Sequence, residues 1–518
     1  MRLIPLLLAI WFIAVPAYVK AQEEHPKKLI EYGWDVPYPD FIEKNIRRME
    51  EKPFDGIVFR LRGLNYAFEL LRWDESELKP QMDTLAAIKW NKFTHNFLCL
   101  QSTNKWGMNW FDDVGWHTIT ANLRLAGKAA RIGHCVGICL DPEPYGSNPW
   151  VYSQQWSDKS FSEVEAQVRK RGAEFILALQ QELPELRLLT FFQLSQLKSI
   201  ARESDPAKRR KRLSEDDYAL LPAFLNGMLD AVGPGVRIID GNESAYYYTD
   251  FESFDEAYQF MHEGALVFIT PENRDKYRSC VQAGMAIYTD NALNLRQPEG
   301  NYVSYFLSPQ DRLLWFKHNV YYAIKTADEY VWCYSERMDW WREDIPSGAE
   351  ESIRFARQKI NRRQPLGFTI DNIASVKRYY GFQALKNGEA EILESCPKFI
   401  EFITAIDKIK KEARSVTKQI NALLEKRAQE ACVRGAARTP EQREKEWEAE
   451  KGKELQVPEF HRKPWLPEEE RLKPLKSKDP EMYKLALQKY KLEEELKEVR
   501  QRLKDCIEGG DCKCGAVN

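Results

Sequence analysis

Residues 136–145, VGICLDPEPY, are the stretch from which the fold is predicted. The apolar run 136–140 ends abruptly, and Asp141, Pro142 and Glu143 follow it. A short apolar run bounded by proline is typical of a strand covered on both faces, as strands of parallel sheets are. Acidic residues that directly follow such a strand would lie at the carboxyl edge of the sheet.

Seven more runs of this kind occur between residues 28 and 360, and amphipathic stretches separate them. The predicted strands are 29–32, 56–61, 94–100, 136–140, 186–193, 236–240, 285–289 and 330–334, and the predicted helices are 41–51, 119–131, 162–182, 217–232, 308–326 and 349–361. Such alternation is typical of a parallel sheet with helical crossovers. Eight units in roughly 330 residues fit a (β/α)8 barrel, so we predict an α/β TIM barrel with a charged helical C-terminal extension.

An open doubly wound sheet is the competing architecture. It usually carries a glycine-rich phosphate loop after an early strand. The chain has neither G-x-G-x-x-G nor G-x-x-x-x-G-K-[ST], which favours the barrel.

The two ends of the chain predict the remaining organisation. Arg2, the apolar run 3–15 and the small residues around Ala21 are typical of a signal peptide, residues 1–21, which is removed on export. The apolar run is shorter than the ~20 residues of a spanning helix. We therefore expect a secreted or periplasmic protein without a membrane span in its mature chain, with a barrel domain at 28–396 and an extension at 397–518.

The extension is rich in Lys, Glu and Arg and predicts two long helices, 399–429 and 482–506, joined by a proline-broken connector at 439–480. A helical hairpin is the simpler interpretation. The alternative is a coiled coil that binds a partner or a second copy through 482–506, where leucines recur at heptad-like spacing.

Charge and cysteine usage exclude some classes of function. Lys and Arg total 76 against 78 Asp and Glu, so a strongly basic nucleic-acid-binding face is not expected. Cys99, Cys139 and Cys333 lie in apolar strand-like runs and are expected to be buried rather than bridged. A bridge is considered only among the C-terminal cysteines Cys432, Cys506, Cys512 and Cys514, and its pairing is not readable from spacing.

Several predicted strands end in acids, and the carboxyl ends of barrel strands are where barrel enzymes carry their active sites. Cleavage of a glycosidic bond needs one carboxyl group to protonate the leaving oxygen and another to attack or to activate water. Glu143 is the first choice for general acid/base, with Asp141 as the alternative actor. Glu243 and Glu336 are the candidate partners, and Asp240 and Asp290 are candidate substrate ligands or orienting groups.

The loops after the strands are also rich in aromatic residues, since the chain has 15 Trp and 23 Tyr. Flat rings with a polar edge suit the faces and hydroxyls of sugars. The candidate sugar-binding residues of this kind are Trp34, Trp106, Trp110, Tyr145, Tyr246 and Trp340. Each could instead serve loop packing, and their shared location favours a site.

The leader, the eight units, Asp141-Pro142-Glu143 closing the fourth strand and the acids that close later strands resemble the secreted (β/α)8-barrel glycoside hydrolases over residues 28 to 360. This resemblance implies a carbohydrate substrate, O-glycosyl hydrolase activity and no cofactor. The Asn-Glu pair usual on the fourth strand of the large retaining clan is replaced here by Pro142-Glu143, which leaves the nucleophile and the retaining mechanism open.

The sequence lacks the motifs that are typical of other classes of hydrolase. The chain has seven His without H-x-H or H-E-x-x-H, which disfavours a metal site, and no G-x-S-x-G nucleophile elbow. A non-catalytic carbohydrate-binding or surface protein remains the alternative to a hydrolase, because a fold alone does not establish an activity.

Overall fold

The structure is a computed structural model that describes residues 26–102, 107–145, 147–152, 158–295, 304, 307–370, 397–436, 472–473, 476–477 and 479–508. The expected signal peptide at 1–21 and Trp106 lie outside the described residues, as do the side chains of Cys432, Cys506, Cys512 and Cys514.

The strands in the described part of the chain form one parallel sheet with the order β7-β6-β5-β4-β3-β2-β1-β9-β8. The strands are β1 (Lys28–Gly33), β2 (Gly56–Phe59), β3 (Phe97–Gln101), β4 (Gly137–Asp141), β5 (Arg187–Thr190), β6 (Arg237–Asp240), β7 (Val281–Ala283), β8 (Met285–Tyr288) and β9 (Tyr330–Ser335). Only Gly284 separates β7 from β8, and β7 pairs with β6 while β8 pairs with β9. The run 281–288 therefore joins the two ends of the sheet and closes an eight-membered barrel, as predicted.

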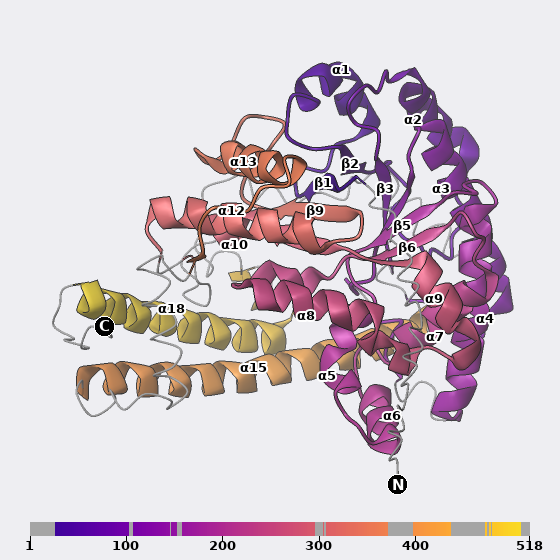
Figure 1. Cartoon of the computed structure of the whole chain (residues 1–518). Helices are drawn as coiled ribbons and strands as arrows, with labels where there is room; N and C mark the ends of the chain where they lie inside the picture. Colours follow the sequence, from indigo (N-terminus) through magenta and orange to yellow (C-terminus); the bar gives the residue numbers. More distant parts are fainter. Residues whose placement is uncertain are drawn as a thin grey trace, which may run out of the picture.

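Helices surround this barrel (Figure 1). The longer ones are α1 (Pro39–Met49), α2 (Glu75–Ala87), α3 (Asp113–Ile132), α4 (Phe161–Gln180), α7 (Leu221–Ala231), α8 (Phe251–His262), α12 (Pro309–Thr326) and α13 (Ala349–Asn361). The shorter ones are α5 (Lys198–Ala201), α6 (Pro206–Ser214), α9 (Arg274–Cys280) and α10 (Thr289–Leu293), with the 3-10 turns η2 (Leu194–Leu197), η3 (Glu243–Tyr247), η4 (Gly264–Phe268) and η5 (Pro271–Asn273). All eight predicted strands and all six predicted barrel helices are confirmed, whereas α2 and α8 were not predicted.

Helices α4 and α7 pack against each other at very short range because glycines face each other's backbone. A Cβ on Gly227 would lie 1.8 Å from the carbonyl oxygen of Arg169, and one on Gly172 would lie 2.1 Å from that of Phe224. The absence of side chains at these positions is therefore what permits the close approach.

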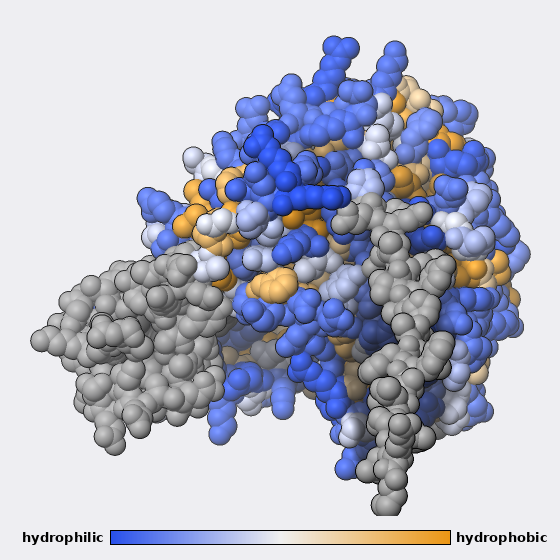
Figure 2. Space-filling view, in the orientation of Figure 1, coloured by the Kyte–Doolittle hydropathy of each residue, from blue (hydrophilic) through white to orange (hydrophobic). Residues whose placement is uncertain are grey.

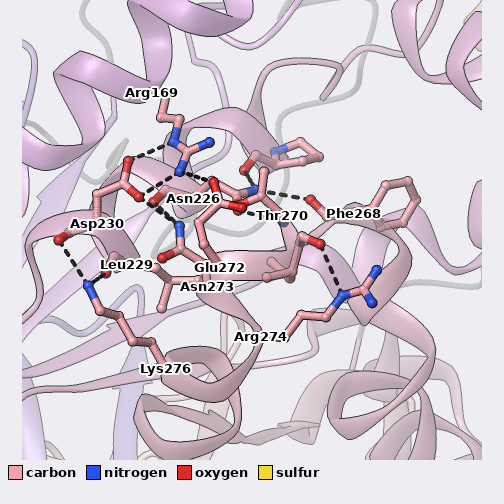
Figure 3. Close-up of polar contacts among 12 residues, drawn as sticks. Arg169, Asn226, Leu229, Asp230, Phe268, Thr270, Glu272, Asn273, Arg274 and Lys276 are labelled. Atoms are coloured by element: carbon pink, nitrogen blue, oxygen red, sulfur yellow. Dashed lines mark hydrogen bonds and ion pairs between the residues drawn. The ribbon is translucent and has the colours of Figure 1, made fainter.

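A polar network ties the same two helices to η5 (Figure 3). Arg169 on α4 donates to Asp230 on α7 at 2.6 Å and to Glu272 at 2.8 Å, and Asn273 donates to Asp230 at 2.8 Å. These groups satisfy one another on the outer helical layer. The network is a structural brace of that layer.

The inside of the barrel is filled by aromatic side chains that meet across it. Tyr32 on β1 and Phe191 directly after β5 have ring centroids 4.6 Å apart, although β1 and β5 lie on opposite sides of the barrel. Phe191 stacks on Trp332 at 4.2 Å, and Tyr334 stacks on Tyr246 at 5.5 Å. We call these rings the aromatic floor, because they close the barrel below its mouth: Tyr32, Phe191, Tyr246, Trp332 and Tyr334.

The C-terminal extension contains two long helices, α15 (Pro397–Ala436) and α18 (Pro480–Glu508), which lie side by side (Figure 1). They share their own buried core, formed by Ile406, Ile409, Val416, Leu492, Leu496 and Val499. An ion pair between Arg427 and Asp479 joins α15 to the start of α18. The predicted helical extension is confirmed, and partner binding through 482–506 stays a prediction.

The face drawn in Figure 2 is hydrophilic over most of its described surface, and its hydrophobic residues form small separate patches. Within the described ranges, no helix combines the length and the apolar character needed to cross a bilayer.

Candidate functional site

Three acids from two strand ends meet at the mouth of the barrel. Asp141 is the last residue of β4 and is 1% exposed, and its Oδ1 accepts the backbone N–H of Glu143 at 3.0 Å. Glu243 follows β6 and donates its backbone N–H to the carbonyl of Phe191 at 3.0 Å. Asn242, at φ 45°, turns the chain out of β6 so that Glu243 reaches this position. We call Asp141, Glu143 and Glu243 the acid cluster.

The three carboxyl groups act on one another's protonation. Burial, and then the negative charge of Glu143, raise the pKa of Glu243 to about 8. The same two causes, in the same order, raise the pKa of Asp141 well above its usual range, and Glu243 adds a smaller contribution. At neutral pH Glu243 therefore keeps its proton beside Glu143, and the pKa of Asp141 is shifted in the same direction, as expected where like charges are brought together in a poorly solvated place.

Tyrosines line this cluster. The hydroxyl of Tyr145, on the rim and 59% exposed, donates to Oε2 of Glu143 at 2.6 Å. Tyr218, just before α7, lies near the same acids. Burial and then the charges of Glu143 and Glu243 raise its pKa. Sequence reasoning missed Tyr218, which lies far along the loop and helix region after the fifth strand and not directly at a strand end.

Glu336 lies in a different network at the mouth. Its Oε1 accepts the hydroxyls of Tyr288 at 3.0 Å and of Tyr334 at 3.2 Å, and Trp34 Nε1 donates to the same Tyr334 hydroxyl. The carboxylate that raises the pKa of Glu243 is Glu143. The structure therefore couples Glu143 to Glu243, while Glu336 is held by tyrosines of β8 and β9.

Asp240 and Asp290, expected as substrate ligands, are bonded to the protein itself. Asp240 is 1% exposed and accepts backbone N–H groups of Gln193 at 3.0 Å and Ser195 at 2.8 Å, together with the Ser195 hydroxyl at 2.5 Å. Buried Asp290 accepts the N–H groups of Glu336 at 2.8 Å and of Arg337 at 2.6 Å. Their oxygens brace the loops around the mouth, in line with the orienting role considered for both, and a part in binding substrate stays a prediction.

Two of the rings predicted to bind sugar are buried in the core. Trp110 and Trp340 are 1% and 0% exposed, and Trp110 Nε1 donates to the carbonyl of Pro149 at 2.9 Å. A fully buried ring offers no face to a sugar, so both residues belong to the core. Tyr246 is part of the aromatic floor. Half-buried Trp34 and exposed Tyr145 remain at the mouth, where the prediction placed them.

No group of three or more His, Cys, Asp or Glu among the described residues is placed to hold a metal ion. Cys99, Cys139 and Cys333 are buried and unbridged, as predicted.

Comparisons with known proteins do not identify a family for this chain. No family model matches the sequence, and no curated protein matches it either. Among solved structures, a mutant of the O-GlcNAc hydrolase of Thermobaculum terrenum aligns over 94% of this chain and 97% of that chain, with 9% sequence identity and a TM-score of 0.33. A likeness of this size does not bear on the activity of this chain.

Proposed function

We propose that this chain is an exported glycoside hydrolase that cleaves a poly- or oligosaccharide with Glu243 and Glu143. The observation that carries the proposal is that Glu143 and Glu243, which follow β4 and β6, meet at the mouth of the barrel, where burial and then the charge of Glu143 raise the pKa of Glu243 to about 8. A carboxyl group that stays protonated at neutral pH, next to a second carboxylate, is what glycosidic cleavage requires.

In this mechanism Glu243 gives its proton to the leaving glycosidic oxygen as the bond to the anomeric carbon breaks. Glu143 attacks that carbon or takes a proton from an attacking water, while the Tyr145 hydroxyl holds one of its oxygens. Asp141 positions Glu143 through its backbone N–H. The proton donor is therefore Glu243, and Glu143 takes the partner's role in place of the general acid first expected of it.

Aromatic residues support a sugar substrate. Trp34 and Tyr145 lie at the mouth, and the rings of the aromatic floor lie inside the barrel. Rings of this kind pack against the apolar face of a pyranose.

The test is hydrolysis of a polysaccharide panel by the purified mature chain and its variants. Glu243→Gln and Glu143→Gln are each expected to lower kcat by at least about 100-fold, the usual effect of losing an acid or base, and to keep glycan binding. The matched control is Glu43→Gln, at an exposed position of α1. Activity of the unmutated chain should fall as the pH rises through about 8, where Glu243 loses its proton.

Binding without turnover in the unmutated chain would instead favour a non-catalytic carbohydrate-binding protein. If turnover is found, the anomer released first decides between retention and inversion, which imply carboxyl separations of ~5–5.5 Å and ~6.5–9.5 Å, respectively.

We also infer the division into a leader at 1–21, a barrel domain at 28–396 and an extension at 397–518. Its support is that the core of the α15–α18 hairpin is separate from that of the barrel. The mass of the exported protein would test cleavage after Ala21.

A further inference from the structure

Arg60 brings a positive charge into the mouth of the barrel. It directly follows β2, whose register with β3 places Phe59 beside Leu98 and so sets Arg60 level with Cys99. Its guanidinium donates to the hydroxyl of Tyr32, in the aromatic floor, at 3.4 Å. Cys99 and, to a smaller extent, Asp141 also act on its charge. Arg60 therefore lies between the floor and the acid cluster, and it is only half-buried.

Within the described part of the chain, this guanidinium forms no ion pair with a carboxylate. Among the residues that the structure describes, no Asp or Glu oxygen lies within 4.0 Å of it, whereas Arg62, two residues further on, pairs with Asp40 at 2.9 Å. Burial, and then the charge of Glu143, raise the pKa of Asp141 well above its usual range, so this acid offers Arg60 less negative charge than an ordinary carboxylate would. A half-buried guanidinium without a carboxylate partner keeps N–H groups that can donate to an oxyanion, so an anionic ligand would stabilise it.

The neighbouring thiols respond to this charge. The pKa of the Cys99 thiol is lowered, first by a hydrogen bond from Cys139 and then, against the effect of burial, by Arg60. The register of β3 and β4 sets the two cysteines side by side. The lowered pKa of this thiol shows that the guanidinium charge acts on groups inside the barrel, just below the acid cluster.

We propose that the mouth binds a glycan carrying an anionic group, a uronic acid carboxylate or a sulfate ester, and that Arg60 recognises that group. The inference rests on the proposed function and adds the substrate class to it. The planar fork of a guanidinium matches two oxygens of a carboxylate or a sulfate. The raised pKa values of Glu243 and Asp141 reduce the repulsion that an acidic sugar would otherwise meet.

The experiment measures binding calorimetrically on the inactive Glu243→Gln protein, with three probes of equal length: an oligouronide, a sulfated oligosaccharide and a neutral oligosaccharide. One acidic probe is expected to bind at least about tenfold more tightly than the neutral one, a typical effect of one charge-assisted pair. Adding Arg60→Gln should remove this preference, and adding Arg62→Gln should leave it in place. The acidic probe that is preferred distinguishes carboxylate from sulfate.

Equal binding of acidic and neutral probes would overturn the inference, as would a preference that survives Arg60→Gln. If Arg60→Gln does not fold, Arg60→Lys replaces it, and a preference reduced but kept is then expected because the charge remains without the fork. Cleavage of neutral glycans by the unmutated chain with no acidic preference would reject this inference alone. No cleavage of any glycan would reject the proposed function, while acidic binding lost with Arg60→Gln would still support the site.

A spectroscopic measurement is independent of turnover. When an acidic probe binds, the guanidinium charge is shared with the ligand, so the ultraviolet absorbance of the Cys99 thiolate should fall. The Cys99→Ser protein should lack this change. An unchanged absorbance on saturation with an acidic probe would contradict contact between that probe and Arg60.

Discussion

The replacement Glu243→Gln should stabilise the folded chain in alkaline solution and leave its stability unchanged in acid. In the unfolded chain this carboxyl group ionises near its ordinary pKa of 4.5, and in the folded chain near about 8. Between these values the folded state holds a proton that the unfolded state has released. The stability that depends on this group is therefore complete below pH 4.5 and is lost as the pH rises through 8.

The interval between the two values, 8 minus 4.5, spans about 3.5 pH units, and each unit corresponds to ~1.36 kcal/mol. The full loss would be ~4.8 kcal/mol, and because water reaches part of the side chain we expect ~2–4 kcal/mol. Glutamine does not titrate, so the variant escapes this loss. Its advantage in the free energy of unfolding should appear above pH 4.5 and level off above about pH 8.

The assay is denaturant unfolding of the unmutated chain, Glu243→Gln and the surface control Glu43→Gln, followed by circular dichroism at several pH values. The difference in the free energy of unfolding between the unmutated chain and Glu243→Gln should grow with pH, and Glu43→Gln should show no such growth. A constant difference at every pH would refute the burial of Glu243 beside a charged Glu143. A variant that became relatively less stable with rising pH would mean that Glu243 is held as an anion.

Three further outcomes are expected. Glu143→Ala removes the charge that raises the pKa of Glu243, so the alkaline loss of stability should move to lower pH in the same unfolding series. Gly227→Ala should lower the free energy of unfolding by about 1–3 kcal/mol or prevent folding, because its Cβ would lie 1.8 Å from the carbonyl of Arg169; thermal unfolding measures this. Val416→Asp buries a charge in the hairpin core, so it should reduce helix content by circular dichroism without moving the unfolding midpoint of the barrel.

The strands could be predicted because a parallel barrel needs residues that are apolar on both faces, and such runs are visible in the chain. Helix α2 could not, because Pro80 lies inside it and its apolar residues do not form a clear stripe. The division of the seventh strand was also missed. At Gly284 the chain changes from pairing with β6 to pairing with β9, and a Cβ there would lie 2.8 Å from Ile239 and 3.1 Å from the carbonyl oxygen of Asp240, so glycine fits this crossing point.

Sequence spacing alone could not show which acid after β6 lies at the mouth of the barrel. Asp240 and Glu243 follow the same strand three residues apart, and either could have been the carboxylate at the mouth. The difference arises from Asn242, whose left-handed backbone at φ 45° sends the chain outward after Asp240 has turned to cap the loop beyond β5. Because a backbone dihedral of this kind leaves only a weak trace in sequence, spacing alone could not show that Asp240 braces a loop while Glu243 reaches the acid cluster.

The assumption that aromatic residues in strands belong to the core and that those in loops belong to the site holds only in part. Trp110 and Trp340, both in loops, are buried, whereas Tyr32 and Tyr334, both in strands, reach the mouth. In an eight-stranded barrel the inward side chains of the last strand positions are also the base of the site. The Tyr334 hydroxyl accepts from Trp34 and donates to Glu336, so a strand residue positions two loop residues. Packing of the barrel and the shape of its mouth therefore depend on the same side chains, and a substitution such as Tyr334→Phe would disturb the site while leaving its ring in the core.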